Sequence, residues 1–100
     1  MRPVLSVDLI CAARVVMAAP RLCQASVAQA LIVEAETADW HRRTYGEIHP
    51  HFGDGTLAGA ARSTDMADER TVCDGEFAQA LMVVLQTILR RAVRKHREQE

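Results

Sequence analysis

The final segment constrains the fold most, because residues 74 to 100 have the pattern of one helix with an unusually broad apolar side. At about 100° per residue, its apolar side chains cover about half of the circumference. A helix on the surface of a monomer needs an apolar stripe of only about 100°. The pattern therefore predicts a helix that other helices or other subunits cover. Its apolar face consists of Phe77, Leu81, Val84, Leu85, Ile88, Leu89 and Ala92, flanked by Met82 and Val93.

The rest of the chain also favours helices over strands. Alanine has the highest helix propensity and is abundant, whereas there are only five glycines and three prolines. A chain of 100 residues is the size of one domain, and so small a domain leaves much of its surface exposed. We predict a single all-α domain in which a short N-terminal helix packs on an antiparallel hairpin of two long helices, in an oligomer.

Turn-forming and capping residues set the limits of the first two helices. Ser6 is a suitable N-cap for a helix over residues 6–18. Pro20 ends this helix and opens the next one, because proline is accepted in a first turn but not in a helix interior. The second helix is predicted over residues 20–45, where Gly46 ends it.

The second half of the chain is predicted to contain one loop and one long helix. Residues 46–73 are rich in turn formers and polar side chains, with a short helix at 57–62 after a Thr56 cap. Asp74 can cap the last helix, predicted over residues 75–97. Two long helices joined by a loop are the basis for the predicted hairpin.

The long second helix has apolar residues on two sides, which indicates either a sandwiched helix or one shared between subunits. Trp40 lies opposite the Leu31 face, and tryptophan is enriched in interface hot spots. The alternative is that Trp40 packs beneath the loop of residues 49–52, and the sequence leaves both readings open. The predicted oligomer interface comprises Leu22, Val33, Trp40, Phe77, Leu81, Leu85 and Ile88.

The charges are unevenly distributed, although the formal net charge is only −1. Residues 47–76 carry seven acidic and two basic side chains, whereas residues 90–97 carry five basic ones. We predict that the basic cluster contacts nucleic acid or an acidic partner, weakly and in a salt-sensitive way. The alternative is a solvated face whose cations are favoured by the helix dipole. The basic cluster comprises Arg90, Arg91, Arg94, Lys95 and Arg97.

No motif in the sequence indicates catalysis, and we predict no catalytic residue, no cofactor, no metal and no enzyme activity. His49 and His51 are of a type that binds transition metals, but their spacing matches no strong motif, so we interpret them as structural. The turn at residues 53–56 lacks the pattern of a phosphate-binding loop. The three cysteines are scattered, without a CxxC spacing.

The sequence predicts a cytoplasmic protein with no membrane partner. Asp8 and Arg14 interrupt the apolar N-terminus before it reaches the length of a signal-peptide core. No stretch has the roughly 18 apolar residues of a membrane-spanning helix. An odd number of scattered cysteines fits a reducing compartment.

Three segments carry a family resemblance: the opening Arg2-Pro3-Val4-Leu5 with Asp8 and Ala12-Ala13-Arg14, the segment Glu34-Ala35-Glu36-Thr37-Ala38-Asp39, and the loop His49-Pro50-His51-Phe52-Gly53-Asp54-Gly55-Thr56-Leu57. They resemble a family of short alphaproteobacterial proteins associated with gene transfer agents. These agents are phage-like particles that package host DNA, and in their gene clusters a short reading frame precedes the large terminase. The resemblance covers most of the chain up to Ala61 and extends more loosely to the last helix.

The resemblance implies a protein similar to a small terminase subunit, which forms a ring, engages DNA and passes it to the ATP-driven large terminase. Its implied partners are further copies of itself, the large terminase and non-specifically bound DNA. Residues 20–45 and 75–97 would form the oligomerisation core. The chain departs from the family pattern, because Arg14 is the only cation of the first helix and no recognition helix is apparent. The rival reading is a dimeric interaction or regulatory module that uses the Trp40 face and has no role with DNA.

Overall fold

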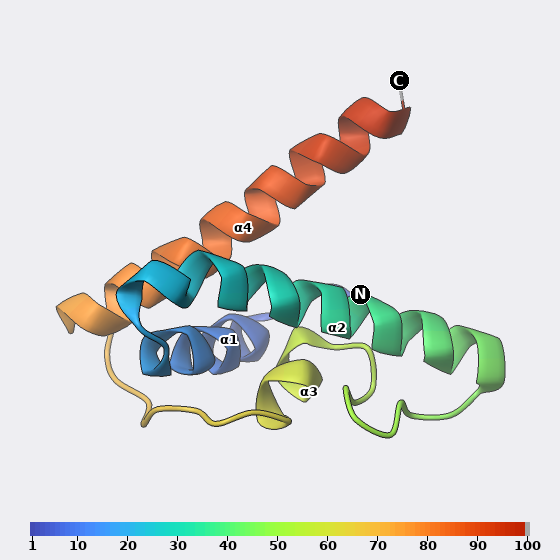
Figure 1. Cartoon of the computed structure of the whole chain (residues 1–100), viewed down its shortest axis with the longest axis horizontal. Coiled ribbons are helices and arrows are strands. Elements are labelled where there is room, and N and C mark those ends of the chain that lie inside the picture. The colour runs from blue at the N-terminus through green and yellow to red at the C-terminus, as the bar shows by residue number, and fades with distance from the viewer. Residues whose placement is uncertain (100) are drawn as a thin grey trace.

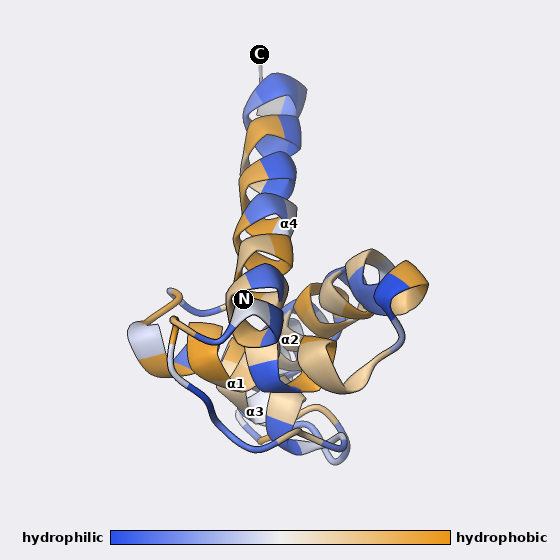
Figure 2. Ribbon diagram, turned by 90° about the vertical axis from the view of Figure 1, so that its left-hand side faces the viewer, coloured by the Kyte–Doolittle hydropathy of each residue, from blue (hydrophilic) through white to orange (hydrophobic). Residues whose placement is uncertain are grey.

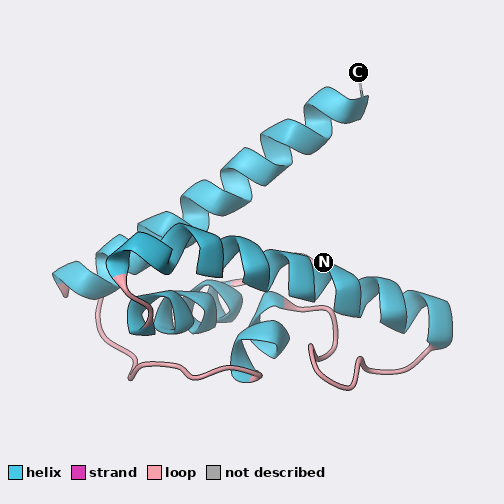
Figure 3. Ribbon diagram, in the orientation of Figure 1, coloured by secondary structure: helices cyan, strands magenta, loops and turns pink. Residues whose placement is uncertain are grey.

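Helix α1 (Ser6–Ala18) lies at the centre of the fold in the computed structural model of the chain, with the other helices around it (Figure 1). The structure describes residues 1–99, and the side chains of residues 1–98. Apart from one isolated bridge between His49 and Gly53, all regular structure in residues 1–99 is helical, which confirms the all-α class (Figure 3). The other elements are η1 (Arg21–Cys23), α2 (Gln24–Tyr45), α3 (Leu57–Arg62) and α4 (Gly75–Gln99).

The core is built largely from alanine, which allows the helices to approach closely. Helix α1 packs most extensively on α4 and then on α3. Few large side chains are fully buried, and Ile32, Leu57 and Val84 fill the space between the helices. Close helix contacts gain dispersion energy in place of the area that large side chains would bury. The small buried residues are Cys11, Ala12, Ala13, Ala28, Ala35, Ala38, Ala58, Ala60, Ala61 and Ala80.

Asp8 joins the start of α1 to the start of α3. Its carboxylate is only 2% exposed and accepts two backbone hydrogen bonds, from Leu5 N–H at 2.7 Å and from Ala58 N–H at 2.9 Å. Leu5, not Ser6, is the N-cap residue, because Asp8 reaches back to its N–H. One buried side chain therefore satisfies free N–H groups at two helix ends.

The helix limits agree with the sequence except at the start of the second helix and at the end of the last one. Residues 21–23 form the 3-10 turn η1, in which Cys23 N–H donates to the Pro20 carbonyl, so α2 begins at Gln24. The short helix lies at residues 57–62, as predicted, and Thr56 Oγ1 accepts from Gly59 N–H at 3.0 Å.

Helix α4 begins where predicted and runs two residues further, to Gln99. Asp74 Oδ1 accepts from the N–H groups of Glu76 and Phe77 at 3.1 Å each, so it caps the helix. The Phe77 hydrogen bond is the main reason that the pKa of Asp74 lies below its ordinary value.

The glycine-rich loop before α3 presses directly against α2. Gly55 has φ = +93°, and a Cβ atom built on it would lie 2.8 Å from the Cα atom of Asp39. No other residue type can make so close a crossing at that backbone angle. The loop is thereby fixed across α2, which brings Leu57 and α3 beneath the core.

The structure does not show the antiparallel hairpin that we predicted. Helices α2 and α4 start on the same side of the molecule and run in the same general direction, diverging toward their ends (Figure 1). Ala25 near the start of α2 faces Thr87, and Glu36 further along binds Arg91 and Lys95. The connection over residues 46–74 carries the chain back under α1 to the start of α2, which makes the two long helices parallel.

The two halves of α4 have different surroundings. Its first half is buried by Phe77, Ala80 and Val84, which pack in the core. Its second half projects away from the other helices, and hydrophobic residues continue along it (Figure 2). Leu89 on this part is 64% exposed.

Candidate functional site

The structure divides the predicted basic cluster into paired and unpaired cations. Glu36 on α2 binds Arg91 through two hydrogen bonds, one of them from Arg91 Nε at 3.0 Å. Its Oε2 also accepts from Lys95 Nζ at 2.7 Å. We call this contact between α2 and α4 the Glu36 clamp.

The Glu36 clamp favours the charged forms of both Glu36 and Arg91. Partial burial on its own would raise the pKa of Glu36, but hydrogen bonds and charges from Arg91 and Lys95 outweigh it and lower the pKa. The hydrogen bond to Glu36 raises the pKa of Arg91. The clamp is therefore a charged contact at neutral pH, with the Glu36 side chain only 19% exposed.

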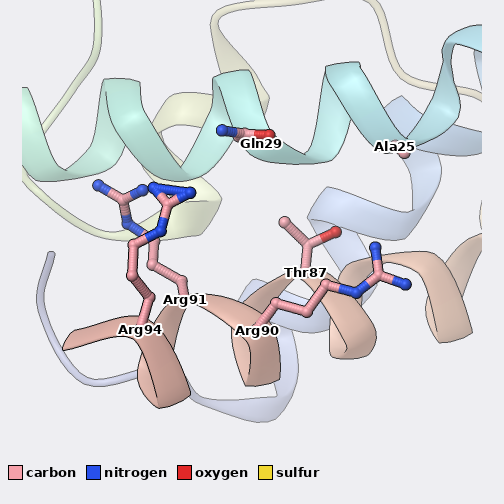
Figure 4. Close-up of a pocket in the computed structure, with 6 residues that line it drawn as sticks. All are labelled: Ala25, Gln29, Thr87, Arg90, Arg91 and Arg94. Carbon is pink, nitrogen blue, oxygen red and sulfur yellow. The ribbon is translucent and has the colours of Figure 1, made fainter. Parts of the chain in front are cut away.

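The other three cations, Arg90, Arg94 and Arg97, are exposed and form no ion pair within the described part of the chain. Arg90, Arg91 and Arg94 line a groove of about 140 Å³ between α2 and α4 (Figure 4). Arg97 lies closer to the end of the helix and outside the groove. The groove is completed by Ala25 and Gln29 from α2 and by Thr87 from α4.

The predicted oligomer interface is also divided by the structure. Phe77 is 2% exposed and belongs to the core of the chain itself, so it is not available to a second subunit. Leu81 and Ile88 are partly buried against the same core. Leu22, Val33, Trp40 and Leu85 are exposed.

Helix α4 carries an exposed apolar stripe, of which only Leu85 was part of the predicted oligomer interface. We call it the α4 stripe, and its members recur every three or four residues, which places them on one side of a helix. The apolar arc is broad enough for two faces, and sequence alone does not tell which of them meets the core. The α4 stripe consists of Met82, Leu85, Leu89 and Val93.

A second exposed apolar row consists of Leu22 on η1 and of Val33 and Trp40 on α2, and we call these three residues the α2 row. Trp40 is 54% exposed and contacts Tyr45 edge to face, with ring centroids 5.9 Å apart. The loop that was expected to cover it packs on the neighbouring His41 instead, whose ring lies 5.0 Å from that of His49. Of the two readings, the structure supports the exposed tryptophan.

Residues 2–88 match the sequence family described as a domain of unknown function, DUF7742. The chain belongs to this family. No curated protein and no solved structure shows detectable similarity to it. The match ends at Ile88, so the DUF7742 region includes α1, α2, α3 and the packed half of α4. The basic cluster and the outer half of the α4 stripe lie beyond it.

In this DUF7742 chain, His49 stabilises the turn of the loop. His49 Nδ1 accepts the N–H groups of His51 and Phe52 at 3.1 Å each, and its ring stacks on Phe52. Desolvation, with smaller effects from the charges of His41 and His51, lowers the pKa of His49. Among the residues that the structure describes, no three His, Cys, Asp or Glu side chains gather in a way that could hold a metal.

Within residues 1–99, no helix combines the length and the apolar character that crossing a membrane requires.

Proposed function

We propose that the protein is a small terminase-like adaptor of a phage-like DNA-packaging system, which assembles into a homo-oligomer and contacts DNA without sequence preference. The resemblance of its first 61 residues to the gene transfer agent family supports the class. The observation that carries the proposal is the projecting half of α4. It presents exposed Leu89 and Val93 on one side and the unpaired Arg90 and Arg97 beside them.

Two separate apolar surfaces support a head-to-tail assembly. Rings form from heterologous contacts, in which one patch of a subunit meets a different patch of the next, whereas a twofold dimer needs only one patch. The α4 stripe and the α2 row lie on different helices and are both exposed. In the proposed ring, the α4 stripe of each subunit packs on the α2 row of its neighbour.

The DNA contact is proposed to be electrostatic. Arginine binds phosphate through a rigid fork of N–H donors, and phosphate contacts carry no direct sequence information. Within the basic cluster, Arg90, Arg94 and Arg97 have no ion pair in the described chain and are the cations available for it. Arg91 and Lys95 are already bound to Glu36. The adaptor would pass DNA to a large terminase that supplies the ATPase.

Native mass spectrometry over a range of concentrations tests the assembly. The 11.1 kDa chain is expected to form a discrete species larger than a dimer. Leu89→Asp places a charge on the α4 stripe and Trp40→Asp places one on the α2 row, and each is expected to abolish the assembly. In a mixture of the two variants each supplies the patch that the other lacks, so a heterodimer is expected. A mixture that stays monomeric would contradict head-to-tail contact.

A DNA mobility shift at several salt concentrations tests the contact with DNA. The double variant Arg94→Glu and Arg97→Glu is expected to lose binding and salt dependence. The control Arg21→Glu and Arg62→Glu makes the same change in net charge at two exposed arginines far from the end of α4, and it is expected to retain most binding. Equal loss in both variants would indicate that only the net charge matters.

The exposure of Trp40 favours one alternative, a helical interaction or regulatory module that binds another protein and never meets DNA. In that case the protein is silent in the DNA assay at all salt concentrations. A stable protein partner would then be lost in Trp40→Ala, while the three unpaired arginines could be replaced without effect.

A further inference from the structure

The groove between α2 and α4 has a composition that is unusual for two packed helices. Three of the six residues that line it are arginines, and within the described chain no carboxylate lines it. Figure 4 shows Arg91 and Arg94 extending toward α2, while Arg90 extends along the groove in the direction of Ala25. The Arg90 guanidinium lies toward one end of the groove and those of Arg91 and Arg94 toward the other, so an anion between the two ends would be attracted from both sides.

Only one of these arginines has an ion pair in the described structure. Arg91 on α4 is bound by Glu36 on α2, which holds the Arg91 guanidinium group against α2. Arg90 and Arg94 keep all of their N–H donors available, and Gln29 adds a side-chain amide from the opposite wall. The Thr87 hydroxyl donates to the Val83 carbonyl at 2.7 Å, so it contributes no donor hydrogen to the groove.

The size of the groove limits what it can hold. A volume of about 140 Å³ leaves room for a group as small as one phosphate. Pockets for drug-sized ligands are larger, at about 300–1,000 Å³. The small side chain of Ala25 leaves one end of the groove free.

We infer that this groove is a phosphate-binding site, in which Arg90 and Arg94 hold one phosphate group of a nucleic-acid backbone and Gln29 binds it from α2. The inference rests on the proposed function for the source of the phosphate. It goes further because it assigns the phosphate contact to a groove lined by both α2 and α4, and not to the charged surface of α4 alone. Arg91 is a positioning residue that the Glu36 clamp keeps at the edge of the groove.

A pair of substitutions on α2 tests the groove without altering any cation. Ala25→Glu places a carboxylate in the groove, and Ala30→Glu places the same group on an exposed position of the same helix outside it. Fluorescence anisotropy with a short labelled DNA duplex is measured on the full chain at several salt concentrations. Ala25→Glu is expected to weaken binding about tenfold or more, and Ala30→Glu by less than about twofold.

Two arginine variants add a second measurement. Because each neutralised phosphate contributes about 0.9 to the slope of log affinity against log salt and Arg90 and Arg94 share one phosphate group, Arg90→Ala with Arg94→Ala should reduce that slope by about one. Arg97 lies outside the groove, so the effect of Arg97→Ala on the slope should add to that of the pair. If the wild-type chain binds DNA and Ala25→Glu and Ala30→Glu weaken that binding equally, the groove is not the phosphate-binding site. The proposed function would still stand.

A protein that binds no DNA would instead contradict the proposed function, and inorganic phosphate then tests the groove separately. Phosphorus NMR titration of the wild-type chain and Ala30→Glu should detect binding that Ala25→Glu lacks, which would support a site for free phosphate. Absence of phosphate binding in the wild-type chain as well would overturn both proposals.

Discussion

The two halves of α4 share one helix and one apolar stripe that continues through both, yet they have opposite surroundings. In residues 75–88, Phe77 and Val84 are buried against α1 and the rest of the core. In residues 89–98, Leu89 and Val93 are exposed on a helix that extends beyond the other elements. The Glu36 clamp lies close to the boundary between the halves. Apolar periodicity therefore marks a surface for contact, and whether that contact lies within the subunit depends on how far the other helices reach.

The first half of α4 serves the folding of the chain, and the second half is exposed for contacts with partners. The first half contributes to the free energy of unfolding of the isolated chain, because its side chains lose their burial when the chain unfolds. The second half has little to lose on unfolding and is the part offered to partners.

The largest contrast is expected between Phe77→Ala and Leu89→Ala. Loss of the buried phenylalanine should lower the free energy of unfolding by about 3–5 kcal/mol, because the cavity adds to the lost transfer energy. Leu89→Ala at an exposed site should change it by less than about 0.5 kcal/mol. Urea denaturation at low protein concentration measures both. Similar losses in the two variants would contradict the division of the helix.

Asp8→Ala is expected to be the next largest effect, at about 2–4 kcal/mol, because it leaves the N–H groups of Leu5 and Ala58 without an acceptor. Helix α1 supports the first half of α4, so hydrogen exchange should show faster opening of both together. The projecting half should exchange at an unchanged rate. As a control, Asp65→Ala removes an exposed carboxylate and should have no measurable effect.

Glu36→Gln should lower the free energy of unfolding by about 1 kcal/mol, since the lost contact is charged but partly exposed. The measurable consequence is faster hydrogen exchange around Arg91 and Lys95, with little change near Phe77. Glu34→Gln is the matched control, because burial alone raises the pKa of Glu34 and no ion pair is lost. Identical behaviour of the two variants would show that the clamp does not hold α4.

The smallest effects are expected in the pH dependence of stability, in two windows. The pKa of His49 is lowered from 6.5, so the unfolded chain takes up the proton first and stability falls as the pH drops below about 6.5. The pKa of Glu36 is lowered from 4.5, so its contribution is present above about pH 4.5 and is lost as the pH falls below that value. Urea midpoints against pH measure both steps.

Glu36→Gln should reduce the lower step and keep the upper one. The lower step should not vanish, because the pKa values of Asp39, Asp54 and Asp74 are lowered too. His49→Phe should lose the upper step and keep the lower one. A single step shared by all three proteins would show that other groups control the acid response.

Local signals allowed much of the fold to be predicted from the sequence. Thr56 caps α3 and Asp74 caps α4 as expected, because capping depends on residues within one turn of the helix end. The relative direction of α2 and α4 was not predictable from such signals. It depends on the path of residues 46–74, which have no continuous apolar period and are fixed by contacts such as Gly55 against Asp39.

The candidate site was predictable only in part for the same reason. Helical spacing places Arg90, Arg94 and Arg97 on one side of α4, and these are the cations without an ion pair in the described chain. The pairing of Arg91 and Lys95 with Glu36 joins residues more than 50 positions apart, which spacing within one helix does not reveal. The exposure of the α4 stripe likewise depends on where the core ends.

The outer part of α4 is attached to α2 through a single carboxylate, that of Glu36, which can act as a hinge point for the helix. The helix extends about 6 Å beyond Lys95 at about 1.5 Å per residue, so a tilt of about 10° about the clamp displaces its tip by about 1 Å. A polyanion that competes with Glu36 for Arg91 and Lys95 would weaken this attachment when it binds. The direction in which the outer part of α4 points would then change when the polyanion binds.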